Sequence, residues 1–491
     1  MNDTNSYEIV IGLEVHAQLL TQSKLFCGDS IAFGAEPNTH VSPITLAHPG
    51  TLPKMNKKAI ELAIKMGLAC HCEIERNNYF ARKNYFYPDL PKGYQVSQHT
   101  TPICKGGYVK IKTTAGEKKV KLNRIHMEED AGKSLHDVDA DNTSIDYNRA
   151  GTPLIEIVTE PDISSADEAF AYVSEIRKLV RYLEICDGNM EEGSLRCDAN
   201  VSARKKGEIK LGTKVEVKNL NSIRNVKRAI EFEAKRLIEL LENGGTVTQQ
   251  TRSYDADNDI TFATRDKEDA DDYRYFADPD LTPFVLNEKY IDSIRTTIPA
   301  LPEERVRKYT AEYKLPEYDA QVLTEEKEIA DYFEKVVDSF AGGDGSAAEM
   351  RPKAAANWLL GPVKSWLNEN GKVISDFPLQ PGTIATLIQL IDAGKLSFSA
   401  ASTKLFFLLL KDPAGNPEQI AIEQQLIQQS DTSFLEPVIN KVLEKYADKV
   451  AEYKKGKKGL LSLFVGEVMK QSKGKADPKI TNELLLKKLS A

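Results

Sequence analysis

The 491-residue sequence predicts an α+β protein: a mainly antiparallel-sheet domain, then an all-α helical domain and a small α-helical tail domain. In the first 295 residues, several segments alternate apolar and polar residues, which is the period-two pattern of a strand with one buried face. After residue 295, apolar residues recur at helical spacing instead. Prolines mark boundaries near residue 295 and at residues 412–417. The predicted domains are therefore 1–295, 296–412 and 413–491, in keeping with about three domains for this length.

The composition excludes several classes of protein. Hydrophobic residues make up 41% and charged residues 28%, which is ordinary for a globular protein. No run approaches the ~18 apolar residues of a membrane span, and the first six residues lack the features of a signal peptide. Six cysteines in so long a chain do not form a disulfide scaffold. We expect a cytoplasmic protein with no membrane partner.

The charge is distributed unevenly along the chain. The formal net charge is -8, yet residues 454–491 contain ten lysines against three acids, a net of +7. The rest of the chain therefore carries -15, and a basic end on an acidic body suggests contact with a polyanion. Lysines near a helix start suit the phosphates of a nucleic acid, although a lysine-rich surface helix is the plainer alternative. The candidate residues are Lys454, Lys455, Lys457 and Lys458.

The first predicted strand, Tyr7–Leu19, brings two polar side chains to one face. Its odd positions are apolar and its even positions mostly polar. Glu14 and His16 therefore project from the same face, about 6.6 Å apart along the strand. They could share a metal and nucleotide site or simply form a solvent-exposed face.

The stretch Ile125–Lys133 is the densest cluster of chemically active residues in the chain. It holds a histidine, three carboxylates, a glycine and a lysine, a combination suited to a hard cation and to phosphate. The preceding residues shift their apolar phase from even to odd positions, which predicts a β-bulge. Glu128 and Glu129 are adjacent and so face opposite ways, and we expect only one of them to point into a site.

Two further predicted strands contribute polar residues. Glu156 interrupts the otherwise apolar segment 154–159, and an isolated buried carboxylate is costly unless it is paired or bound to a metal. Residues 194–204 alternate cleanly and place Arg196 and Asp198 on their polar face. Amphipathic helices are predicted over 165–186 and 222–241, as packing elements.

Carboxylates with arginine and lysine on one face suit a Mg²⁺–nucleotide site, where metals bridge phosphates and cations stabilise developing charge. Standard nucleotide motifs are absent from the sequence. Gly132, Lys133 and Ser134 copy the end of a P-loop, but Met127 stands where the first glycine is required. We also find no nucleophile-elbow or kinase motif set.

The loop Arg82–Gln95 mixes aromatic residues with arginine and lysine between two prolines and a glycine. Such a loop could stack on bases or line a polar passage, and simple aromatic packing is equally compatible with it. Cys70, His71 and Cys72 suggest a metal motif, but a zinc site would need two more well-placed ligands.

Five long motifs resemble the B subunit of the aspartyl/glutamyl-tRNA amidotransferase family, and the resemblance runs over essentially the whole chain. They are Gly12–His16, Arg82–Asp89, His126–Lys133, Met190–Asn200 and Asp271–Phe276. The resemblance implies a cradle domain with the ATP/Mg²⁺ and aminoacyl-tRNA 3′-end site, a helical domain, and a tail domain that contacts tRNA. It implies that ATP phosphorylates the side-chain carboxylate of a mischarged Glu-tRNA(Gln) or Asp-tRNA(Asn). Ammonia, released from glutamine by the A subunit (the amidase, or glutaminase), then displaces phosphate in a complex that also contains the small C subunit.

The resemblance also implies roles for particular residues. The implied metal ligands are His16, Glu129 and Glu156, and Glu14 and Asp198 are further acids of the ATP–Mg²⁺ site. We expect Glu14, Asp198 and Glu156 to be catalytic, and Glu14, Asp198, Arg196 and Lys133 to bind the nucleotide. The ammonia route is expected to include Lys83, Tyr85, Lys92 and Asp272.

In one place the sequence departs from the family pattern. Many members carry a set of zinc-binding cysteines after the first strand. Here Cys27 is present, but Asp29, Ser42 and Ile44 stand where other cysteines would be expected. We therefore predict no zinc, and stoichiometric zinc by elemental analysis would overturn this. Two alternative functions stay open: a non-catalytic tRNA-binding scaffold and a metal-dependent hydrolase.

Overall fold

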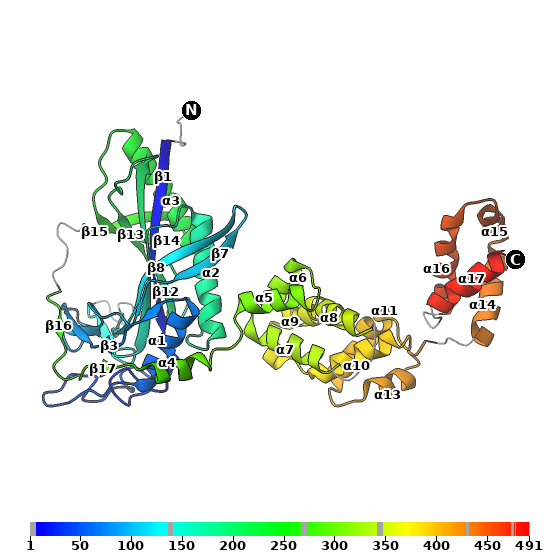
Figure 1. Ribbon diagram of the computed structural model, residues 1–491, viewed down its shortest axis with the longest axis horizontal. Helices are drawn as coiled ribbons and strands as arrows, with labels where there is room; N and C mark the ends of the chain where they lie inside the picture. Colours follow the sequence, from blue (N-terminus) through cyan, green and yellow to red (C-terminus); the bar gives the residue numbers. More distant parts are fainter. Residues whose placement is uncertain are drawn as a thin grey trace. The chain divides into compact units, whose positions relative to one another are not determined.

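The computed structural model describes residues 6–135, 141–266, 273–340, 347–428, 432–472, 476 and 478–490 (Figure 1). Its internal contacts divide the chain into two units, Met1–Leu301 and Pro302–Ala491. The first unit combines a large sheet with packing helices, and the second is helical. The predicted α+β class is confirmed.

The strands of the first unit are short at its lower end and long at its centre (Figure 1). They are β1 Tyr7–Gln18, β2 Glu73–Ile74, β3 Asn77–Asn78, β4 Ala81–Asn84, β5 Tyr94–Ser97, β6 Cys104–Lys105, β7 Tyr108–Thr113, β8 Gly116–Glu129, β9 Lys133–Leu135, β10 Ser144–Asp146, β11 Pro153–Thr159, β12 Leu195–Lys205, β13 Val215–Lys218, β14 Gln250–Asp255, β15 Ile260–Asp266, β16 Phe276–Ala277 and β17 Phe284–Val285. The helices of this unit are α1 Lys57–Ala69, α2 Ala166–Tyr182, α3 Ile223–Glu242 and α4 Glu288–Arg295.

The main sheet has the order β15-β14-β13-β12-β1-β11-β8-β5-β4-β16. Its neighbours pair antiparallel except for β13 and β14, which are parallel. The strand β1 lies at the centre, between β12 and β11. The strands with the clearest period-two patterns are therefore the central strands, which bury one face each.

The apolar face of the sheet forms the core of the first unit. Leu13, Val15 and Ala17 of β1 are fully buried, as are Ile155 and Ile157 of β11. Helices α1, α2 and α3 contact the strands and lie along one side of the sheet (Figure 1). Burial of apolar side chains between these layers supplies the main stabilisation.

The two packing helices begin at capping residues that the sequence supplies. Ser165 accepts a hydrogen bond from the backbone N–H of Glu168, and Ser222 accepts one from that of Asn225. Such caps satisfy N–H groups that have no partner within the helix. Both predicted helices are confirmed, with ends shifted by a few residues.

The predicted bulge in β8 is also confirmed. Thr159 pairs with Leu122 while its neighbour Val158 pairs with Arg124, so that Asn123 is an additional residue in the strand. Before the bulge, Val120 and Leu122 face the core; after it, Ile125 and Met127 do. The bulge therefore keeps both apolar halves of one long strand on the same buried face.

The second unit contains two separate apolar clusters. The first is built by α5 Pro302–Ala311, α6 Glu317–Leu323, α7 Lys327–Asp338, α8 Ala347–Trp358, η2 Leu359–Val363, α9 Lys364–Asn370, η3 Ile374–Asp376, α10 Pro381–Asp392, α11 Phe398–Ala400, η4 Ala401–Leu405, α12 Phe406–Lys411 and α13 Pro417–Glu423. The second is built by α14 Thr432–Lys445, α15 Ala447–Lys454, η5 Lys458–Leu460, α16 Leu461–Gln471 and α17 Pro478–Ser490. The helical character predicted after residue 295 is confirmed. Among the described residues, no helix is both long and apolar enough to span a membrane.

Candidate functional site

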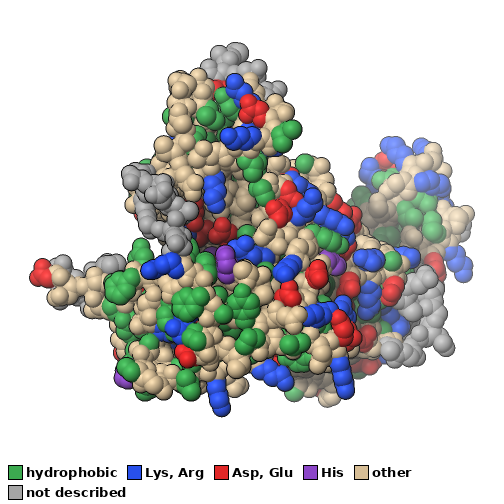
Figure 2. Space-filling view, turned by 60° about the vertical axis from the view of Figure 1, so that its left-hand side comes forward, with side chains coloured by type: hydrophobic (Ala, Val, Ile, Leu, Met, Phe, Trp, Pro, Cys, Tyr) green, Lys and Arg blue, Asp and Glu red, His purple; other side chains and the backbone are tan. Residues whose placement is uncertain are grey.

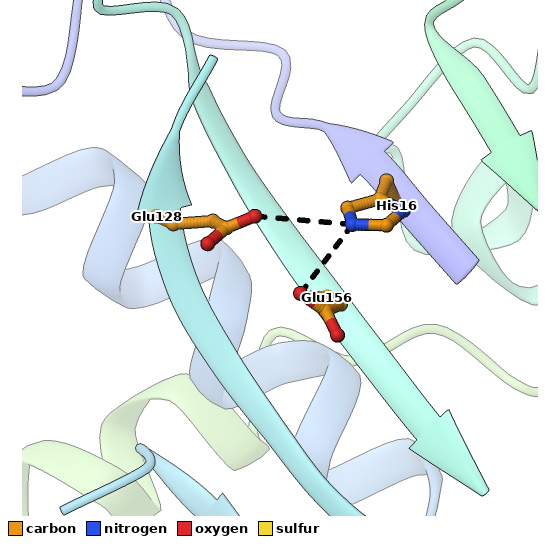
Figure 3. Close-up of side chains that lie close together, drawn as sticks. All are labelled: His16, Glu128 and Glu156. Carbon is orange, nitrogen blue, oxygen red and sulfur yellow. Dashed lines mark ion pairs between the residues drawn. The ribbon is translucent and has the colours of Figure 1, made fainter. Parts of the chain in front are cut away.

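Three side chains from three neighbouring strands meet on the polar face of the main sheet. His16 comes from β1, Glu128 from β8 and Glu156 from β11 (Figure 3). The His16 Nε2 atom lies 3.4 Å from Glu156 Oε2 and 3.8 Å from Glu128 Oε1. The three potential ligand atoms lie within 4.8 Å of one another, which is close enough to bind a single cation.

Strand register explains why these residues meet. His16 stands directly opposite Glu156, and Glu156 stands opposite His126 in the next strand. Glu128 is two residues beyond His126 and so projects from the same face. The His126 Nε2 atom lies 3.3 Å from Glu156 Oε2, which makes His126 a fourth member of the cluster that the sequence did not identify.

Glu128, and not Glu129, is the acid beside His16 and Glu156. Glu129 projects from the other face of β8, where its carboxylate pairs with Lys92 and accepts a 2.8 Å hydrogen bond from the Val96 backbone N–H. The expectation that placed Glu129 with His16 therefore differs from the structure. The apolar phase of Ile125 and Met127 already indicates that even-numbered residues face away from the core.

The cluster strongly favours charged side chains. Burial alone would raise the pKa of Glu156, but His126 and His16 hold that pKa well below its usual value. Burial would also raise the pKa of Glu128, but His126 and Lys83 together lower it below its usual value. Burial lowers the pKa of His126, yet Glu156 and Glu128 raise it to about 9. The carboxylates are thus anionic at neutral pH, the form that binds cations.

The donor set fits a divalent cation. Two buried carboxylates and an imidazole converge, and Glu128 Oε2 is buried without a hydrogen-bond partner among the described residues. A buried acceptor without a donor is costly unless something satisfies it. Mg²⁺ commonly takes one or two carboxylates and completes its shell with water or phosphate oxygens, while imidazole also suits transition metals.

The polar face continues from this cluster across β1 and β12. Glu14 accepts a 2.9 Å hydrogen bond from Asn200 Nδ2, and its pKa is raised by burial and by Glu156 and Asp198. Asp198 lies opposite Glu14 and contacts Lys218 Nζ at 2.7 Å. Glu14 and Asp198 are therefore neighbours on the same face, as the sequence predicted.

Arg196 is held in place by an acid that the sequence analysis did not assign. Its Nη2 atom lies 2.9 Å from Asp130 Oδ2, which also accepts a 2.8 Å hydrogen bond from Gln18 Nε2. Arg196 stands opposite His16 in the register of β12 and β1. The arrangement fixes a guanidinium beside the carboxylate cluster. Acidic, basic and histidine side chains lie close together around a hollow of the first unit in the space-filling view (Figure 2).

A pocket of about 290 Å³ opens on the polar face beside Glu14. Its lining includes Gly12, Asn200, Ser202 and Lys214 together with apolar residues of β1 and β11. Small-molecule sites typically measure about 300–1,000 Å³ and combine an apolar lining with a few polar groups. The pocket and the cluster share two strands, β1 and β11, and Glu14 of β1 lines the pocket two residues before His16.

The residues expected on an ammonia route are only partly brought together. Lys92 pairs with Glu129 and lies 5.5 Å from the centre of the Tyr94 ring. Lys83 Nζ lies 5.8 Å from the centre of the Tyr85 ring. Burial lowers the pKa of Lys83, but Glu128 and other nearby groups raise it, and the net effect is a rise. Tyr85 donates a 3.3 Å hydrogen bond to Gln95 Oε1. Asp272 lies outside the described residues.

Lys133 and the tail lysines are exposed. Lys133 lies on β9, in a separate two-stranded sheet with β10. Lys454, Lys455, Lys457 and Lys458 follow one another at the end of α15 and the start of η5, and all are exposed. Lys458 Nζ lies 4.3 Å from the centre of the Tyr453 ring, and Lys457 contacts Glu452 at 2.9 Å.

Cys27 belongs to a polar hydrogen-bonded cluster. Its Sγ lies 3.3 Å from Asp29 Oδ2 and 3.4 Å from Thr45 Oγ1, and the Ser42 backbone N–H also donates to Asp29. These contacts connect the loop segments that the family resemblance associates with zinc-binding cysteines.

The chain therefore has the form of an antiparallel-sheet protein whose polar face carries a carboxylate–histidine cluster suited to a divalent cation, beside a pocket of small-molecule size. Two family models match the chain: "GatB/GatE catalytic domain" over residues 9–292 and "GatB domain" over residues 331–489. The chain belongs to the GatB family.

Curated relatives match over nearly their whole length. A protein from Geotalea daltonii is 50% identical over 486 residues, covering 98% of this chain and 99% of that relative. A protein from Geobacter sulfurreducens is 49% identical, and one from Caldanaerobacter subterraneus is 47% identical, each covering 99% of both chains. All three relatives are named as the B subunit of aspartyl/glutamyl-tRNA(Asn/Gln) amidotransferase.

Proposed function

We propose that this chain is the aminoacyl-tRNA kinase and transamidase component of a tRNA-dependent amidotransferase. It uses ATP to phosphorylate the side-chain carboxylate of Glu-tRNA(Gln), Asp-tRNA(Asn) or both, and ammonia then displaces phosphate to give Gln-tRNA(Gln) or Asn-tRNA(Asn). The observation that carries the proposal is the cluster of His16, Glu128 and Glu156 beside the pocket at Glu14. The family membership and the names of the relatives support the substrate class.

Phosphorylation solves a chemical problem. A free carboxylate is a poor acyl donor, whereas an acyl phosphate carries a good leaving group. Catalysis of phosphoryl transfer depends mainly on positioning and on stabilising the charge of the phosphoryl oxygens. A bound Mg²⁺ supplies part of that stabilisation.

We assign different parts of this catalysis to different side chains of the polar face. Glu128 and Glu156, with His16, would hold the cation, which would supply charge stabilisation to the phosphates. The pocket beside Glu14 accepts the rest of the nucleotide, with Asn200, Ser202 and Lys214 as polar contacts. Arg196, fixed by Asp130, offers a guanidinium to the developing negative charge.

Glu14 and Asp198 extend the negative charge of this face toward the pocket. Cations bound with a nucleotide would offset the repulsion between these acids and the phosphates, and would favour the ionised form of Glu14. We assign both acids to the ATP site on this basis.

Ammonia must come from another chain. We assign glutamine hydrolysis to the amidase, the A subunit of the complex, which the small C subunit completes. Half-buried Lys92 and buried Glu129 form an ion pair on the opposite side of β8 from the cluster. We assign them, with Lys83 and Tyr85, to the passage that ammonia follows. The proposed location of this complex is the cytoplasm.

The test of the catalytic proposal is Glu156→Gln in the complex assembled with the amidase and the small C subunit. Loss of the carboxylate removes charge stabilisation worth several kcal/mol, so amide formation should fall at least about 100-fold. Affinity for the mischarged tRNA should stay near normal. If amide formation continues at the wild-type rate, the chain is a tRNA-binding scaffold whose acids are structural.

The test of the tail proposal is removal of residues 432–491. The four candidate lysines then disappear together with other exposed lysines of the tail, so tRNA affinity should fall and depend less steeply on salt concentration. Cutting here keeps α13, whose Ala421 is buried in the larger apolar cluster of the second unit. Glutaminase activity of the complex should be unchanged, and unaltered tRNA affinity would count against a role for the tail.

A further inference from the structure

The β8 bulge determines which side chains of this strand reach the polar face. Without the additional residue Asn123, the alternation set by Val120 and Leu122 would continue, and even-numbered residues would face the core. Because of the bulge, Arg124, His126 and Glu128 share the polar face instead. Glu128 belongs to the cation cluster, and Arg124 and His126 precede it on the same face of the same strand.

Arg124 contacts His126, and His126 in turn contacts Glu156. The Arg124 Nε–H donates a 3.3 Å hydrogen bond to His126 Nδ1. On the other side of the ring, His126 Nε2 lies 3.3 Å from Glu156 Oε2 and 3.8 Å from Glu128 Oε2. A guanidinium cannot accept a hydrogen bond, so this contact requires Nδ1 to be the acceptor. Nδ1 can accept only in the neutral ring, so the contact places the proton of His126 on Nε2, where it faces the two carboxylates. A bound cation would favour this neutral ring, because it would offset the charge of the two acids that raise the pKa of His126.

The two histidines of the cluster differ in accessibility. The His126 side chain is 6% exposed, and the His16 side chain is 17% exposed. Both Nε2 atoms approach the same oxygen, Glu156 Oε2. If His16 turns its Nε2 lone pair to a cation, His126 is the remaining donor that can fix the Glu156 carboxylate.

We infer that Arg124 and His126 are positioning residues: Arg124 sets the tautomer of His126, and His126 orients the carboxylates of Glu156 and Glu128 for a cation that His16 also binds. The inference rests on the proposed cation site. It assigns His126 a hydrogen-bonding role and excludes it from direct coordination. Outer partners of this kind typically change metal affinity by about 10–100-fold when removed.

The experiment measures Mn²⁺ affinity of the assembled complex, without ATP or tRNA, by electron paramagnetic resonance titration of free Mn²⁺. His126→Leu removes the ring and its donor, and should weaken binding by about 10–100-fold. His126→Gln keeps an N–H near the position of Nε2 and should restore most of that loss. Arg124→Met should weaken binding less than His126→Leu. Arg295→Met, an exposed arginine of α4 with no place in the cluster, is the matched control and should leave affinity unchanged.

A second readout separates positioning from ligation. With ¹⁵N-labelled histidine, pulsed paramagnetic resonance of bound Mn²⁺ should show coupling to one imidazole in the wild type. That coupling should persist in His126→Gln and disappear in His16→Gln. Loss of imidazole coupling in His126→Gln would make His126 a direct ligand and overturn the inference.

The remaining outcomes distinguish this inference from the proposed function. Wild-type Mn²⁺ affinity in a folded His126→Leu complex overturns the inference, even if that complex cleaves ATP normally. The expected order of affinities in a complex that never cleaves ATP supports the inference and overturns the proposed function. If His126→Leu does not fold, Arg124→Met and His126→Gln decide the matter by the same measurement.

Discussion

The two faces of the main sheet are built from alternate residues of the same strands, and they follow opposite rules. On β11, Ile155 and Ile157 are fully buried among apolar side chains, while Glu156 between them lies among histidines and carboxylates. The apolar side chains are stabilised by packing against one another in the core. The polar face concentrates carboxylates and offsets their charge in part with histidine, arginine and lysine side chains. The apolar face therefore stabilises the fold, whereas the polar face is less stable than it could be because its residues are arranged for binding.

The largest effect on the fold should come from the apolar face. Ile157→Ala leaves a cavity beside the cluster without changing its charges, and should lower the free energy of unfolding of the first unit by about 2–5 kcal/mol. Denaturant unfolding measures this loss. At temperatures where the variant is folded, Mn²⁺ affinity should match the wild type. An Ile157→Ala variant with unchanged free energy of unfolding but weaker Mn²⁺ binding would show that the apolar face contributes directly to cation binding.

The adjacent glutamates of β8 give a sharper comparison, because they differ only in the face they occupy. Glu128→Gln removes a charged ligand, and it should weaken Mn²⁺ binding by more than the roughly 10–100-fold typical of losing an outer hydrogen-bond partner. Glu129→Gln should leave Mn²⁺ affinity near normal, because Glu129 pairs with Lys92 on the other side of the strand. Isothermal titration of both variants tests this. The reverse order of affinities would return Glu129 to the cation site.

The smallest effect should be a gain in stability. Burial and two neighbouring acids raise the pKa of Glu14, so the folded protein binds this proton more tightly than the unfolded chain does. Stability from this group is greatest at low pH and is lost as pH rises through the raised pKa. Glu14→Gln should therefore raise the unfolding temperature of the cation-free protein at neutral pH. A lower unfolding temperature would mean that the Glu14 carboxylate contributes to the fold.

Much of this site could be predicted from alternation alone. The strands that carry Glu14, His16, Arg196 and Asp198 have clear period-two patterns, whereas Glu156 was singled out as the one carboxylate of an otherwise apolar segment. Strand register then brings these residues to one face. The phase shift in β8 predicted its bulge. Alternation and the phase shift can be read from neighbouring residues, because each strand must keep its apolar side chains on the one buried face of the sheet.

What sequence reasoning missed depends on contacts between distant segments. The apolar phase after the bulge already favoured Glu128, but the resemblance suggested Glu129. His126 was noticed only as part of an acidic stretch, because its role depends on Glu156 in another strand. Asp130 was likewise not assigned, since its partners Arg196 and Gln18 come from β12 and β1. Such pairings are tertiary and leave no local pattern.

The central claim is that the polar face binds a cation and uses it to transfer phosphate. The most direct test follows γ-³²P from ATP in the complex with the amidase and the small C subunit, with and without Mg²⁺, in the presence of Glu-tRNA(Gln) or Asp-tRNA(Asn). The account predicts Mg²⁺-dependent ATP cleavage that the aminoacyl-tRNA stimulates, that couples to amide formation, and that Glu128→Gln and Glu156→Gln abolish. ATP left intact while tRNA is bound, or cleavage that survives both substitutions, would contradict it.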